Sequence, residues 1–79
     1  MKFKQPFVDE LNILALFDLS NTQQGIKIHH DADNEQLSAA NRLFKKGLID
    51  QADGGYLTNA GCIAAEHVQA LLQLLSTND

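Results

Sequence analysis

Two short clusters combine histidine with acidic residues or cysteine, which are the side chains that most often bind metal ions. The first cluster is His29, His30 and Asp31, and the second is Cys62, Glu66 and His67. Adjacent histidines on a strand point to opposite faces, and residues five apart on a helix also lie on different faces. The chain has no HExxH or CxxC spacing either. We therefore expect no metal ion and no other cofactor.

Enzymatic chemistry finds no support in the other residues. General acid–base catalysis needs titratable groups that converge in a pocket, whereas the acidic residues are scattered over the expected helix starts and turns. The phosphate-binding motifs GxxxxGK and GxGxxG do not occur. The sequence predicts that the protein is not an enzyme.

Arg42, Lys45 and Lys46 form a cation cluster that could contact nucleic-acid phosphates. The same charges could instead serve only their own helix, because cations stabilise the C-terminal end of a helix dipole. The chain has 6 Lys and Arg against 10 Asp and Glu, and its net charge is −4. This balance argues against nucleic-acid binding by the chain as a whole, so a DNA-binding face would have to be local.

The helix that carries these cations is expected to run from about residue 34 to Lys46. Asp33 with Gln36 resembles a capping box, and Asp31 is an alternative start. Gly47 is placed to end the helix in the left-handed conformation. At ~100° per residue, apolar residues share one side of the helix: Leu37, Ala40, Leu43, Phe44 and Leu48. Polar residues gather opposite: Asn34, Ser38, Asn41 and Lys45, flanked by Arg42 and Lys46.

The other elements follow from local patterns. Residues 5–19 are expected to form a helix whose apolar stripe includes Phe7, Leu11 and Leu14. The breaker segment 20–25 precedes a short strand with an edge position at 26–30, and whether 20–25 contains a helical turn stays open. Strands at 48–50 and 56–58 are expected to flank QADGG, because Asp-Gly favours a turn. Thr58 should cap a last helix over 59–76.

These elements predict a mostly helical α+β fold with a small β-hairpin, in one domain over residues 1–79. A core this small supplies little stability, and the helix 59–76 has apolar surface to spare, so we expect a homodimer through that helix. The single cysteine, Cys62, and the lack of a signal peptide favour a cytoplasmic location. No apolar stretch approaches the ~20 residues that span a bilayer.

The run NRLFKKGLIDQADGGYLTNAG resembles the end of bacterial winged-helix regulators, in which a recognition helix is followed by a hairpin wing and another helix. With GIKIHHDA included, the chain resembles a small bacterial family of short, uncharacterised proteins labelled DNA-binding. The resemblance implies a winged-helix-like fold and a transcriptional regulator that binds double-stranded DNA. It implies that the wing is 51–55 and that the DNA-facing residues are Asn34, Ser38, Asn41, Arg42, Lys45 and Lys46.

A protein–protein interaction module on the same scaffold, without nucleic-acid affinity, is the alternative. The expected wing carries Asp50 and Asp53 but no Lys or Arg, which suits a protein partner better than a phosphate backbone. The charge distribution discriminates between the two functions. A continuous positive patch that joins Lys27 to the cations of the helix would favour DNA, and carboxylates that interrupt it would favour the alternative.

Overall fold

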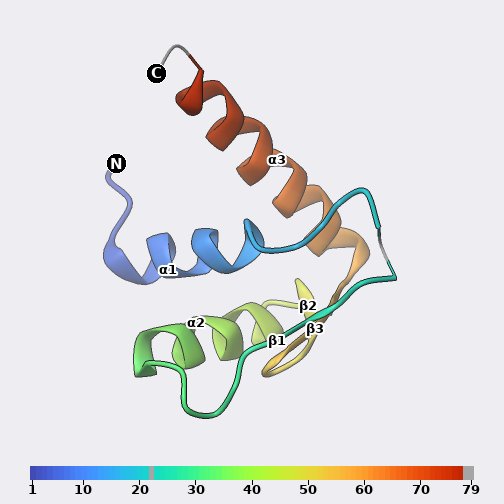
Figure 1. Ribbon diagram of the computed structural model, residues 1–79. Helices are drawn as coiled ribbons and strands as arrows, with labels where there is room; N and C mark the ends of the chain where they lie inside the picture. Colours follow the sequence, from blue (N-terminus) through green and yellow to red (C-terminus); the bar gives the residue numbers. More distant parts are fainter. Residues whose placement is uncertain (22, 78–79) are drawn as a thin grey trace.

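The computed structural model describes residues 1–21 and 23–77, which form three helices and a three-stranded antiparallel sheet (Figure 1). The elements are α1 (Gln5–Leu14), β1 (Ile26–Lys27), α2 (Asn34–Lys45), β2 (Ile49–Gln51), β3 (Gly54–Leu57) and α3 (Asn59–Ser76). The order of strands in the sheet is β1-β3-β2, so β1 has the edge position expected for it. This architecture confirms the α+β class.

The core lies where the helices and the sheet meet. Its largest fully buried side chains are Ile13 of α1, Leu43 of α2 and Ile49 of β2. The other buried apolar residues are Leu14, Phe17, Ile28, Ala39, Ala40 and Ala65. Each helix and the hairpin therefore contributes to one cluster, and the relative positions of α1, α2 and α3 depend on it.

α1 is shorter than the sequence predicts, because it ends at Leu14 and not near residue 19. The side chain of Gln69 on α3 explains this early end. Its Nε2 donates hydrogen bonds to the carbonyl oxygens of Leu14, at 3.2 Å, and Phe17, at 2.8 Å. Carbonyls that would otherwise accept bonds along a longer helix are thus satisfied by another element. Phe17 packs into the core from the following turn and is 4% exposed.

Local signals define both ends of α2 correctly. Asp33 is the N-cap, and its side chain accepts a hydrogen bond of 2.9 Å from the backbone N–H of Gln36. At the other end Gly47 has φ 79°. The N–H groups of Gly47 and Leu48 donate to the carbonyls of Phe44 and Leu43, each at 3.0 Å, which completes a Schellman motif.

Each of the two predicted apolar stripes has correctly placed buried members, Ala40 and Leu43 on α2 and Leu14 on α1, but also includes one phenylalanine that is exposed. Phe44 was expected among core residues and is 42% exposed, since it lies about 100° round α2 from the buried Leu43. Ala39 is fully buried in its place, because α1 covers that side of α2. On α1, Phe7 is likewise 50% exposed, whereas Ile13 is buried.

The hairpin has a tighter turn than predicted. Gln51 pairs with Gly54, so only Ala52 and Asp53 connect the strands, and QADGG is not a five-residue loop. Gly54 and Gly55 have φ values of 128° and 70°, which a residue with a side chain adopts only with strain. The pairing shifts register between Ile49 and Gln51.

Thr58 joins the hairpin to α3 as expected. Its hydroxyl accepts a 3.0 Å hydrogen bond from the N–H of Gly61 and donates one of 2.6 Å to the carbonyl of Gly47. Gly61 is buried, and its Cα faces the carbonyl oxygen of Leu48 so closely that a Cβ would overlap that atom. The first turn of α3 therefore packs against the chain that leaves α2.

The breaker segment and the C-terminus fall partly outside the described residues, which exclude Thr22, Asn78 and Asp79. The sequence left open whether residues 20–25 contain a helical turn. In the described part of this segment, which excludes Thr22, the chain forms turns and no helix. No helix in residues 1–21 and 23–77 is long and apolar enough to cross a membrane.

Candidate interaction surfaces

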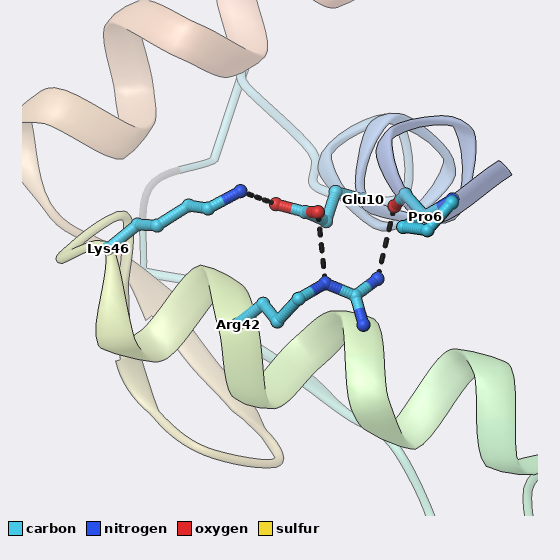
Figure 2. Close-up of polar contacts among 4 residues, drawn as sticks. All are labelled: Pro6, Glu10, Arg42 and Lys46. Atoms are coloured by element: carbon cyan, nitrogen blue, oxygen red, sulfur yellow. Dashed lines mark hydrogen bonds and ion pairs between the residues drawn. The ribbon is translucent and has the colours of Figure 1, made fainter. Parts of the chain in front are cut away.

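Glu10 is a buried carboxylate at the contact between α1 and α2 (Figure 2). Its Oε2 accepts a 3.1 Å hydrogen bond from Arg42 Nε, and its Oε1 accepts one from Lys46 Nζ. Arg42 Nη2 also donates to the carbonyl oxygen of Pro6 at 3.1 Å. Two cations of α2 are thereby tied to α1 through a side chain that is 7% exposed.

The electrostatic consequence is that Arg42 and Lys46 are partly neutralised within the fold. The Arg42 side chain is 35% exposed and that of Lys46 is 45% exposed. The Lys46 ammonium also lies 5.3 Å from the centroid of the Phe7 ring, a cation–π contact. Both cations serve first to hold α1 on α2, which leaves less charge for an external phosphate.

Sequence reasoning missed Glu10, although its position held a signal. Glu10, Ile13, Leu14 and Phe17 have the spacing of one helix face, and all four are buried. A lone carboxylate on an apolar face has to find a cation inside the protein, because an unpaired buried charge is costly. The same reasoning would have pointed to the cation cluster of α2.

Five of the six predicted DNA-facing residues are exposed on α2. Asn34, Ser38, Asn41, Lys45 and Lys46 are exposed, whereas Arg42 is half-buried. A shallow groove of about 330 Å³ separates the start of α2 from α1. Its lining residues are Gln5, Pro6, Asp9, Asn34, Glu35, Ser38 and Arg42. The N-terminal half of the polar arc therefore faces a groove that also contains two carboxylates.

Lys27, which would have to join the cations of α2 in a continuous positive patch, is also paired with a carboxylate. Lys27 Nζ of β1 is 3.2 Å from Asp53 Oδ2 at the turn of the hairpin, and both side chains are exposed. Asp50 Oδ1 accepts a 2.8 Å hydrogen bond from the N–H of Tyr56, so this wing carboxylate is engaged within the hairpin. Carboxylates thus accompany Lys27, Arg42 and Lys46, and within the described residues Lys45 is the cation of this set without an ion pair.

An apolar groove of about 380 Å³ runs between α1 and the C-terminal half of α3. Its lining residues are Phe3, Val8, Leu11, Asn12, Ala15, His67, Val68, Leu71, Leu72 and Leu75. Leu71 and Leu72 are 48% and 52% exposed, and Leu75 is 71% exposed. α3 packs on α1, and its last turns extend beyond the rest of the fold (Figure 1).

The candidate metal ligands do not come together. Among the described residues, no three His, Cys, Asp or Glu side chains are close enough to hold one ion. His29, His30 and His67 are exposed, and Cys62 is a half-buried free thiol.

One exposed carboxylate titrates abnormally, away from the surfaces described above. The Ser20 hydroxyl donates a 2.6 Å hydrogen bond to Asp18 Oδ1, and this bond lowers the pKa of Asp18. The backbone N–H of Ser20 donates to the same oxygen at 3.0 Å and lowers the pKa further. The two hydrogen bonds close the turn after α1, as the side chain of an aspartate often does within its own loop.

A family model described as a family of unknown function (DUF5669) matches residues 1–76. The chain belongs to this family. No curated protein matches the chain, and no solved structure matches it. Membership of DUF5669 therefore assigns no activity, and the function has to be argued from the surfaces themselves.

Proposed function

We propose that this DUF5669 protein is a protein–protein interaction domain that uses the groove between α1 and α3 as its binding surface. The exposed apolar side chains of that groove are the observation that carries the proposal. Leu72 and Leu75 leave half or more of their surface in water, next to Phe3 at 64%. Contiguous apolar surface on a small protein typically marks a binding site for another protein.

The charge distribution supports a protein partner over DNA. Glu10 engages Arg42 and Lys46, and Asp53 engages Lys27, so the positive patch that DNA would need is interrupted by carboxylates. Non-specific DNA affinity comes mainly from cations that neutralise phosphates. A net charge of −4 adds repulsion from the rest of the chain.

The element order supports a winged-helix-like scaffold for this domain. α2, the β2–β3 hairpin and α3 follow one another without intervening segments, as a recognition helix, wing and final helix would. The hairpin turn contains only Ala52 and Asp53, so this wing would be short. We propose a cytoplasmic location, and the single cysteine of the sequence supports it.

Double-stranded DNA binding is the second candidate function, and one observation favours it. Asn41 and Lys45 are exposed on α2, and no ion pair involves Lys45 among the described residues. Asn can read an adenine edge and Lys can bind a phosphate. A regulator of this type would contact DNA through the exposed polar residues of α2. Arg42 and Lys46 would contribute less, because Glu10 partly neutralises them.

In-cell photo-crosslinking distinguishes the two functions. A benzoylphenylalanine is placed either at Leu72, in the groove, or at Asn41, on the exposed arc of α2. We expect protein adducts from position 72 that disappear when Leu75→Glu is added, and no adducts with nucleic acid from position 41. Nucleic-acid adducts at position 41 together with a silent position 72 would overturn the proposal.

A fluorescence-anisotropy titration with mixed-sequence duplex DNA complements this experiment. We expect no binding even at low salt, because too few cations are free of carboxylates. Binding that weakens steeply with salt would favour the DNA function instead. In that case Lys45→Ala should weaken it more than Lys2→Ala, a matched removal of one positive charge from the N-terminal tail.

A further inference from the structure

We infer that the partner in the α1–α3 groove is a second copy of this chain, which forms a two-fold symmetric dimer. The inference rests on the proposed function, because it takes the same groove as the binding surface. It goes further by naming the occupant. Three features of the groove carry it: its area, its lack of charge, and the ridge beside it.

The area matches what a stable dimer requires. Phe3 and the leucines of the last turns, Leu71, Leu72, Leu74 and Leu75, are between 48% and 71% exposed. At roughly 130 Å² for a leucine side chain and 200 Å² for a phenylalanine, these five leave on the order of 400 Å² in water. A standard interface buries about 800 Å² per partner, of which about 56–65% is apolar. The five side chains supply most of that apolar share.

The lack of charge favours a second copy over other occupants. No residue from 67 to 77 is Lys, Arg, Asp or Glu, and α3 has Glu66 as its single charged residue. Partners of other kinds are usually selected by complementary charges, and helices that lie on a lipid surface carry Lys or Arg on their polar side. The groove offers neither. Two acidic chains can meet on an uncharged face without bringing like charges together.

The groove and an adjacent ridge make the surface self-complementary. Leu71, Leu72 and Leu75 line the groove, whereas Leu74 is not among its lining residues and is 70% exposed. A two-fold interface uses the same patch on both copies, so each copy has to supply both a projection and a receiving surface. Leu74 of one copy can be the projection that fills the groove of the other. The last turns of α3 lie at the opposite end of that helix from the hairpin (Figure 1).

Sedimentation velocity over a concentration series tests the inference with the full chain. We expect a reversible dimer with a Kd of about 1 µM or tighter. Leu72→Glu should weaken it at least 100-fold, and Leu75→Gln should weaken it at least 10-fold. Both side chains are half exposed or more, so these variants should fold, which circular dichroism verifies. Ile63→Glu is the matched control, because Ile63 is 57% exposed on α3 but is not among the groove residues. It should change the Kd less than 3-fold.

The outcomes separate this inference from the proposed function. A dimer that Leu72→Glu leaves intact would place the interface elsewhere and overturn the inference. A chain that stays monomeric at about 1 mM would overturn it too. If the Leu72 position then still forms crosslinks with a different protein in cells, the groove remains a protein-binding surface and only the second copy is refuted. Binding of the monomer to uncharged phosphatidylcholine vesicles would show a lipid occupant and refute both.

Discussion

Replacement of Glu10 by Gln should destabilise the wild-type protein but stabilise a variant that lacks its two cationic partners. In the wild type, Glu10→Gln removes one buried charge and leaves Arg42 and Lys46 at 35% and 45% exposure. Both cations can be hydrated again, and this hydration offsets part of the interaction energy that is lost with the carboxylate. We expect a decrease of about 1–2 kcal/mol in the free energy of unfolding.

Removal of the two cations should lower the free energy of unfolding more than removal of the Glu10 charge does. Arg42→Met combined with Lys46→Met keeps most of the apolar stems but leaves the carboxylate of Glu10, 7% exposed, without a cation. An uncompensated buried charge costs about 3–5 kcal/mol. Glu10→Gln added to this double variant removes that charge, and at least about 1 kcal/mol should then be regained. One substitution therefore has opposite signs in the two backgrounds.

Urea unfolding monitored by circular dichroism at a fixed pH measures all four combinations. Lys45→Ala is the control, because it removes an adjacent cation outside the described ion pairs and should change stability by less than about 0.5 kcal/mol. Equal destabilisation by Glu10→Gln in both backgrounds would mean that the three side chains do not interact energetically. The buried ion cluster would then have no part in holding α1 on α2.

Two further predictions concern glycines and titration. Gly61→Ala should destabilise the protein by about 3 kcal/mol or more, because its Cβ would overlap the Leu48 carbonyl, whereas Gly47→Ala meets open space and should cost only about 1 kcal/mol for its positive φ. Thermal unfolding compares the two, and equal losses would contradict the close approach at Gly61. Ser20→Ala should raise the pKa of Asp18, since the hydroxyl is the largest cause of its lowered value. Because the folded-state pKa is lowered, the stability from Asp18 is complete above its ordinary pKa and is lost as pH falls through the lowered one. Carboxyl NMR titration measures the shift, and an unchanged pKa would refute the role of the hydroxyl.

Local signals were sufficient for both ends of α2, the start of α3 and the place of the hairpin. Asp33, Gly47 and Thr58 act within a few residues of their own position, so sequence alone identifies what they do. The end of α1 was not predictable in this way. It depends on Gln69, whose amide reaches carbonyls more than 50 residues away in the chain.

For the candidate surfaces too, the sequence predicts what nearby residues determine and misses what depends on contacts between distant residues. Helical periodicity correctly left Asn34, Ser38, Asn41 and Lys45 in water. It could not show that Arg42 and Lys46 share a carboxylate from another helix, because that contact spans 32 and 36 residues. The groove was anticipated only in part, since the apolar excess of 59–76 was visible but the contribution of α1 was not.

The hydroxyl of Thr58 has a consequence for how the hairpin can vary. It bonds both the last turn after α2 and the first turn of α3, and the N–H of Thr58 donates to the carbonyl of Leu48 at 3.1 Å. The two helices are therefore joined to each other at the base of the hairpin, on the side away from the turn at its tip. Residues inserted between Ala52 and Asp53 would lengthen a loop whose ends are already closed. Evolution could remodel this tip, or an engineer could graft a peptide onto it, while the helical frame keeps its shape.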